Sequence, residues 1–122
     1  MNSNCLSRWA SFKFAFAGIR RLFKEHNFRI HVLIAALTVT AGLLCGLSLV
    51  EWCVLTICFG LVMAAEGINT AVEILADRIC STDDECIRLA KDVAAGAVLL
   101  AVIAAVVVGG LIFSGKFAII FH

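Results

Sequence analysis

The sequence predicts an all-α membrane protein with one surface helix and three transmembrane helices in a single domain (1–122). Three observations lead to this prediction. Hydrophobic residues make up 62% of the chain, well above the roughly 45–50% apolar content of soluble domains. Three apolar runs are each long enough to cross the ~30 Å of bilayer hydrocarbon. Basic residues gather before position 30, where Glu25 is the only acid. A chain of this size encloses little interior, so we expect it to oligomerise.

Residues 6–24 are expected to form an amphipathic helix on the membrane surface. The segment carries too many charges for a membrane span. Apolar side chains recur at the helical period along one face, and basic side chains line its flank: Trp9, Phe12, Phe16, Ile19 and Phe23, with Lys13, Arg20 and Lys24. A basic helix with aromatic residues is typical of a membrane interface. The alternative is a soluble helix that packs on a protein core.

The three apolar runs predict membrane spans at residues 30–50, 52–75 and 93–114. Glu51 and residues 46–48 mark a turn between the first two spans, and Trp52 suits an interfacial anchor. The third span carries a stripe of small residues, which lets helices approach closely. Residues 76–92 read as a polar loop. By the positive-inside rule, the surface helix and this loop are cytoplasmic.

The second span ends in a stripe of polar side chains, which is unusual at membrane depth. Glu66, Asn69, Thr70, Glu73 and Asp77 fall on one helix face, although ionisable groups at membrane depth are costly and usually functional. Counted from the outer interface at Trp52, Glu66 lies ~21 Å deep and Glu73 ~31 Å. The stripe therefore descends from the cytosol into the inner leaflet, where a water-soluble reagent could meet a lipid headgroup.

Each residue in this region has a functional and a structural interpretation. Glu66 could accept the proton of a lipid hydroxyl, or join helices as a hydrogen-bonded carboxyl. Glu73 and Glu25 are candidate Mg²⁺ ligands, because this ion prefers oxygen ligands. Glu25 could equally pair with Arg21 or Arg29. Asn69 could orient a hydroxyl or phosphate, or hold two helices together.

Two residues before the third span suit phosphate chemistry. Lys91 can bind phosphate as a point charge. Asp92 could contact the same ligand, or cap the helix. The acids of the preceding loop, among them Asp83 and Asp84, are by themselves more typical of solvated positions.

Four ordered blocks of residues resemble one known family. The most specific block is Glu66-Gly-Ile-Asn69-Thr70-Ala71-Val-Glu73 followed by Asp77. The others are Phe12, Ala15 and Gly18-Ile19, then Glu25-His-Asn27-Phe28-Arg29-Ile-His31, then Ala90-Lys91-Asp92-Val-Ala-Ala-Gly96-Ala97-Val98. Over roughly residues 8–114 the chain resembles the small bacterial integral-membrane diacylglycerol kinases, which include the undecaprenol kinases.

This resemblance implies a homotrimer in the bacterial inner membrane, with active sites shared between subunits. It implies phosphorylation of a lipid alcohol by ATP with Mg²⁺. Glu66 would be the catalytic base, and Glu25 and Glu73 the metal-binding carboxylates. The remaining site residues follow by position: Asn69 and Ala95 toward the lipid, and Lys13, Glu25, Glu73, Thr82, Asp83, Asp84, Lys91 and Asp92 toward the nucleotide. The loop lacks a histidine that many members carry there.

The resemblance leaves more than one function open. Diacylglycerol is the expected acceptor, with conversion to phosphatidic acid. Undecaprenol is the alternative, because the surroundings of His31 resemble undecaprenol-type members. A function of another class is a non-enzymatic membrane assembly subunit or a proton-conducting bundle, which would use the same polar stripe. We expect no nucleic-acid partner, because the basic residues lie beside lipid-facing aromatic residues.

Overall fold

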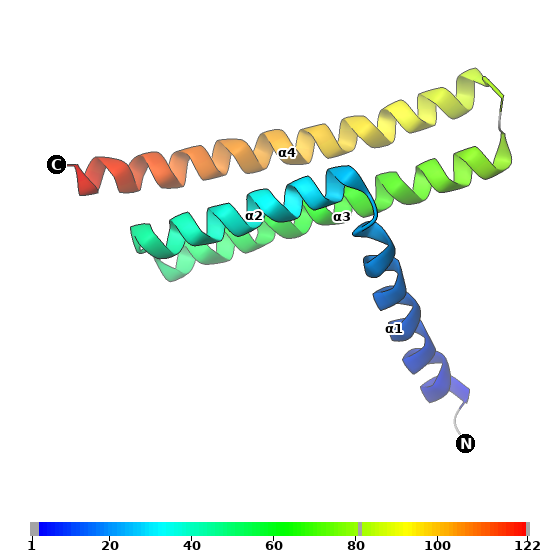
Figure 1. Cartoon of the computed structure of the whole chain (residues 1–122), viewed down its shortest axis with the longest axis horizontal. Helices are drawn as coiled ribbons and strands as arrows, with labels where there is room; N and C mark the ends of the chain where they lie inside the picture. The colour runs from blue at the N-terminus through cyan, green and yellow to red at the C-terminus, as the bar shows by residue number, and fades with distance from the viewer. Residues whose placement is uncertain (1–2, 81, 122) are drawn as a thin grey trace.

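The computed structural model describes residues 3–80 and 82–121. They form four helices: α1 (Ser3–Leu22), α2 (His26–Cys45), α3 (Leu49–Ile79) and α4 (Glu85–Ile120). In Figure 1 the last three run alongside one another, while α1 leaves them at a steep angle. Helices α2, α3 and α4 are long and apolar enough to span a membrane. The predicted all-α membrane fold is thus confirmed. Residues 1–2, 81 and 122, which belong to the predicted domain 1–122, lie outside the described part.

A tight turn joins α2 to α3 where the sequence predicts one. Gly46 ends α2 in the left-handed conformation, with φ of 70°, which glycine adopts without steric cost. Ser48 then caps α3. Its hydroxyl accepts a hydrogen bond from the Glu51 backbone N–H (3.2 Å), and the Glu51 carboxylate accepts one from the Ser48 N–H (2.9 Å). This reciprocal capping box fixes the antiparallel entry of α3.

Helices α3 and α4 extend beyond the predicted spans at the end of the bundle where α3 stops and α4 begins. Of the predicted loop 76–92, residues 76–79 belong to α3 and residues 85–92 to α4. Asp84 caps α4 by accepting hydrogen bonds from the backbone N–H groups of Cys86 (2.9 Å) and Ile87 (3.1 Å). Asp92 therefore is not the cap, because the helix begins two turns earlier. Charged residues suggested a loop, but a helix outside hydrocarbon tolerates them on its surface.

The lengths of these helices exceed a bilayer's hydrocarbon thickness. With 31 and 36 residues, α3 and α4 are about 46 and 54 Å long at 1.5 Å per residue. The hydrocarbon core is only ~30 Å thick, so their polar ends protrude into water. At the far end Lys116 and Glu51 form an ion pair (3.0 Å) that ties α4 to the start of α3.

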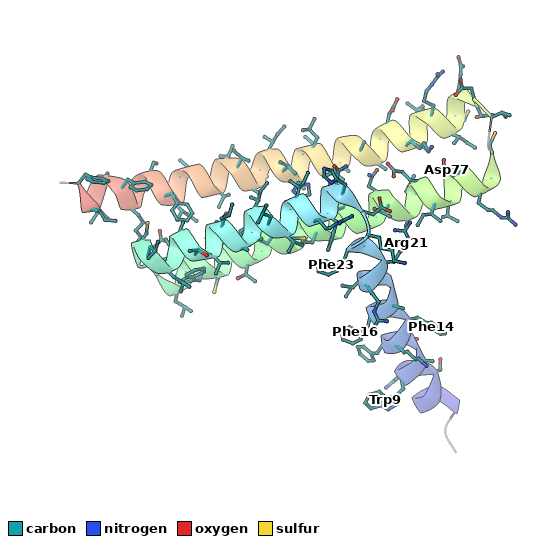
Figure 2. The ribbon with its side chains drawn as sticks, viewed as in Figure 1. Trp9, Phe14, Phe16, Arg21, Phe23 and Asp77 are labelled. Carbon is teal, nitrogen blue, oxygen red and sulfur yellow. The ribbon has the colours of Figure 1, made fainter. Side chains whose placement is uncertain are left out.

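Helix α1 stands apart from the bundle and exposes its aromatic side chains. The side chains of the predicted apolar stripe are all exposed, Trp9 at 76%, and Figure 2 shows Trp9, Phe14 and Phe16 projecting from the helix. Near the end of α1, Leu22 approaches Gly67 of α3. Phe23, just after α1, packs edge-to-face on Phe28 with ring centroids 5.1 Å apart. The exposed aromatic surface suits insertion into a membrane interface.

Candidate active site

The polar stripe of α3 divides into a buried part and an exposed part. Glu66, Asn69 and Thr70 are 5, 9 and 7% exposed, respectively. Glu73 and Asp77, one and two turns further, are exposed. Because α3 is continuous from Leu49 to Ile79, Glu66 and Glu73 are about 10 Å apart along its axis. One straight helix thus joins a carboxylate enclosed between helices to a carboxylate open to solvent.

A histidine of α2 binds the buried carboxylate. Nε2 of His31 lies 3.0 Å from Oε1 of Glu66, and the two side chains are 19% and 6% exposed. Burying an isolated carboxylate is costly, and a hydrogen-bond partner offsets that cost. The sequence stripe on α3 gave no sign of this partner, because His31 lies 35 positions away on another helix.

Asn69 links the two carboxylates of the stripe. Its Nδ2 donates to Oε1 of Glu73 at 3.4 Å. An ionised carboxylate only accepts hydrogen bonds, so this contact turns the amide nitrogen toward Glu73 and the amide oxygen away. That oxygen, Oδ1, is buried without a hydrogen-bond partner among the described residues. An unsatisfied buried acceptor calls for a donor from outside the chain, such as a hydroxyl.

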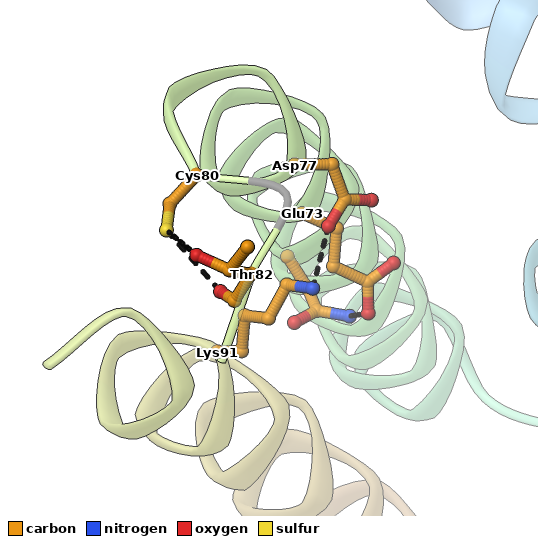
Figure 3. Close-up of polar contacts among 6 residues, drawn as sticks. Glu73, Asp77, Cys80, Thr82 and Lys91 are labelled. Atoms are coloured by element: carbon orange, nitrogen blue, oxygen red, sulfur yellow. Dashed lines mark hydrogen bonds and ion pairs between the residues drawn. The ribbon is translucent and has the colours of Figure 1, made fainter. Parts of the chain in front are cut away.

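A cleft of about 470 Å³ lies where α3 ends and α4 begins, at the end of the bundle that the sequence predicts to be cytoplasmic. Nζ of Lys91 donates to Oδ1 of Asp77 at 2.6 Å and bridges the two helices, as Figure 3 shows. Beside this pair, Sγ of Cys80 contacts the backbone oxygen and hydroxyl of Thr82 at 3.2 and 3.3 Å. The cleft brings together four residues expected to contact nucleotide: Thr82, Asp83, Asp84 and Lys91.

Other predicted site residues do not join this cleft. Lys13 lies on α1, exposed. Glu25 sits just before α2 and accepts a hydrogen bond from Nη1 of Arg21 at 2.7 Å, the alternative that the sequence left open. Asp92 and Ala95 are exposed on α4. In the described part of the chain, none of these four residues lines the cleft.

A second cleft, of about 290 Å³, runs between α2, α3 and α4. Its lining is largely apolar, from Leu55 and Val62 on α3 to Phe113 on α4. His31 lines it as well. The imidazole therefore separates an apolar interhelical space from the buried carboxylate.

The donor set suits a divalent cation held by few protein ligands. Within the described residues, no three His, Cys, Asp or Glu side chains gather into a metal cage. Glu73 is exposed, and Asn69 engages only one of its oxygens. Arg21 likewise engages one oxygen of Glu25. Mg²⁺ is commonly bound by one or two carboxylates with phosphates and water, so each carboxylate has an oxygen available for it.

Comparison with known proteins decides the family. A family model described as prokaryotic diacylglycerol kinase matches residues 13–113. The chain belongs to the prokaryotic diacylglycerol kinase family. This confirms the resemblance found in the four sequence blocks. It also places the chain among lipid kinases, and a kinase family implies a nucleotide as co-substrate.

Individual members of the diacylglycerol kinase family are similar to most of this chain. A diacylglycerol kinase of Synechocystis is 44% identical over 82% of the chain, which spans 58% of that relative's length. An undecaprenol kinase of Bacillus subtilis is 35% identical over 75% of each protein. A diacylglycerol kinase of Sinorhizobium is 31% identical, and the matched region covers 79% of this chain and 70% of the relative.

Proposed function

We propose that this chain phosphorylates the hydroxyl of a membrane lipid alcohol with ATP and Mg²⁺, converting diacylglycerol to phosphatidic acid. One observation carries the proposal. A single helix presents a buried carboxylate, Glu66, on the same face as exposed acids beside a cytoplasmic cleft that holds Lys91. A lipid kinase needs such an arrangement, because its two substrates arrive from different phases.

The residues have distinct roles in this proposal. Glu66 accepts the hydroxyl proton as the lipid oxygen attacks phosphorus. Asn69 offers its free Oδ1 to a donor at the same site. Glu73 and Glu25 hold Mg²⁺, which would supply charge neutralisation on the phosphates. Lys91 adds positive charge in the cleft. Phosphoryl transfer depends mainly on such positioning and charge neutralisation.

We propose that the active protein is a homotrimer with shared sites. Support comes from the predicted nucleotide contacts that do not line the cleft in the described part of the chain, which are Lys13, Glu25, Glu73 and Asp92. The small buried core also favours assembly, since only five hydrophobic residues are buried in the described part. The basic N-terminal segment supports a cytoplasmic N-terminus in a bacterial inner membrane.

Relatives support two acceptor lipids. The Synechocystis and Sinorhizobium relatives are named diacylglycerol kinases, and the Bacillus relative is named an undecaprenol kinase. Higher identity to the first favours diacylglycerol. Undecaprenol is the second candidate, because the Bacillus relative is matched over a larger share of its own length.

A transfer assay tests both the function and the acceptor. Purified protein in mixed micelles receives radiolabelled ATP, Mg²⁺ and either diacylglycerol or undecaprenol, and label in extracted lipid is counted. We expect faster labelling of diacylglycerol. A preference for undecaprenol would replace the acceptor and keep the reaction. Absence of labelling with either lipid would favour a non-enzymatic membrane subunit.

A further inference from the structure

The contact between His31 and Glu66 leaves the two oxygens of the carboxylate in different situations. Oε1 lies 3.0 Å from the imidazole. Oε2 has no side-chain hydrogen bond in the described part of the chain, yet it is not among the fully enclosed unsatisfied atoms. It therefore remains accessible to an incoming group. One oxygen is held by the protein and the other is free.

The proposed mechanism sets the direction of this contact. A carboxylate that acts as a base has to be ionised, and an ionised carboxylate only accepts hydrogen bonds. In that state Nε2 of His31 is the donor, and a neutral imidazole with its hydrogen on Nε2 suffices. The interaction fixes the rotation of the carboxylate without a second negative charge nearby.

The packing of α2 explains why His31 is rigid enough to do this. The inward face of α2 repeats at the helical period and is at least half-buried throughout: Phe28, His31, Ala35, Thr38 and Gly42. Phe28, one turn before His31, is 6% exposed and packs edge-to-face against Phe23. At the other end Gly42 meets the ring of Trp52 from α3. Both ends of this face are therefore fixed, with His31 between them.

We propose that His31 is the positioning residue for the catalytic base. This inference rests on the proposed function. Nε2–H of His31 donates to Oε1 of Glu66 and turns Oε2 toward the lipid hydroxyl. Oε2 takes the hydroxyl proton, the lipid oxygen uses its electron pair to bond the γ-phosphorus of ATP, and the bond from that phosphorus to the bridging oxygen breaks to release ADP. His31 touches neither substrate.

Three substitutions at one position test this role. In His31→Ala the carboxylate loses its only side-chain partner in the described structure, so we expect kcat to fall about 10- to 100-fold. The KM for MgATP should not change, because the cytoplasmic cleft is untouched. His31→Gln should recover most of kcat, since the glutamine amide nitrogen occupies the place of Nε2. His31→Asn is too short to reach Glu66 and should behave like His31→Ala.

Thr38→Val provides the matched control. Thr38 lies two turns further along the same face of α2, and its hydroxyl bonds only the Ile34 backbone oxygen of its own helix (2.8 Å). This variant should retain wild-type kcat. Equal losses in Thr38→Val and His31→Ala would mean that α2 packing alone matters, and would overturn the proposal. Full kcat in His31→Ala, or equal activity of His31→Gln and His31→Asn, would overturn it too.

A spectroscopic measurement separates the contact from the catalysis. The chain has three histidines, and ¹⁵N labelling with comparison to His31→Gln identifies the signal of His31. We expect a protonated Nε2 whose shift changes in Glu66→Ala. An unchanged shift would overturn the contact, whatever the activity. Wild-type protein that phosphorylates no lipid would overturn the proposed function, and the positioning role with it, even where the contact is present.

Discussion

Replacing Glu66 by glutamine tests the core of the proposed mechanism with little change of shape. The amide oxygen can still accept a hydrogen bond from Nε2 of His31, which lies 3.0 Å from Oε1 of Glu66. What disappears is the capacity to take a proton. Loss of a general base typically lowers kcat 10²- to 10⁴-fold, which equals about 3–5 kcal/mol of barrier at 1.36 kcal/mol per tenfold.

The same substitution should leave the fold almost unchanged. Glu66 is 5% exposed, so a substitution that created a cavity or an unpaired group there would destabilise the helices. Glutamine does neither, and we expect the free energy of unfolding in micelles to change by no more than ~1 kcal/mol. Glu51→Gln on the same helix is the matched control. Its partner Lys116 lies at the far end of the bundle, so kcat should remain at the wild-type level.

The assay is initial-rate lipid phosphorylation at saturating MgATP, combined with denaturant unfolding of each variant. A Glu66→Gln variant with kcat within about threefold of wild type would refute the assignment of Glu66 as base. A large loss of activity together with loss of stability would instead support the structural interpretation, in which this carboxyl joins helices.

Three further predictions concern the metal site and the helical hairpin. Glu73→Gln should raise the Mg²⁺ concentration for half-maximal activity about tenfold, because an anionic oxygen ligand becomes neutral; an unchanged titration would count against the assignment. Gly42→Ala should destabilise the fold by about 1–3 kcal/mol, because its methyl would lie 2.7 Å from the Trp52 ring and 2.8 Å from Leu47; unchanged denaturant unfolding would contradict this. Ser48→Ala should cost ~1 kcal/mol through the lost cap, measured in the same way, and equal stability would show that the capping box contributes little.

Much of the fold follows from the sequence because hydrocarbon imposes simple rules. Long apolar runs must be helical, and Gly46 and Ser48 mark the turn between two of them. The end of α3 and the start of α4 were harder to predict, because water does not penalise charge on a helix surface. The sequence suggested Asp92 as a cap, whereas the backbone hydrogen bonds show that Asp84 caps α4.

The candidate site was only partly predictable. The periodicity of α3 placed Glu66, Asn69 and Glu73 on one face. It could not show which face of α2 meets them, because α2 is apolar on nearly all sides. The antiparallel hairpin does contain the signal. Gly42 and Trp52 each lie five residues from residue 47, and His31 and Glu66 lie 16 and 19 residues from it. An antiparallel hairpin centred there brings the histidine to within about one helical turn of the carboxylate.

The sequence alone does not decide whether Glu25 pairs with a neighbouring arginine or binds a metal ion. Its carboxylate was assigned both a metal and an ion-pair role. In the described chain Arg21 occupies one of its oxygens, and the cytoplasmic cleft lies between other helices. The metal role of Glu25 therefore stays a prediction, to be tested in the assembled protein.

Helix α3 is continuous from Leu49 to Ile79, so the distance along it between Glu66 and the cleft does not vary with bilayer thickness. Glu66 and the cytoplasmic cleft are set by one rigid helix, whereas the height of a lipid hydroxyl is set by the surrounding membrane. A thicker or thinner hydrocarbon layer shifts the hydroxyl along the helix axis, at a cost of fractions of a kcal/mol per Å of mismatch. Under the proposed function, we therefore expect the reaction rate to depend on the acyl-chain length of the host bilayer.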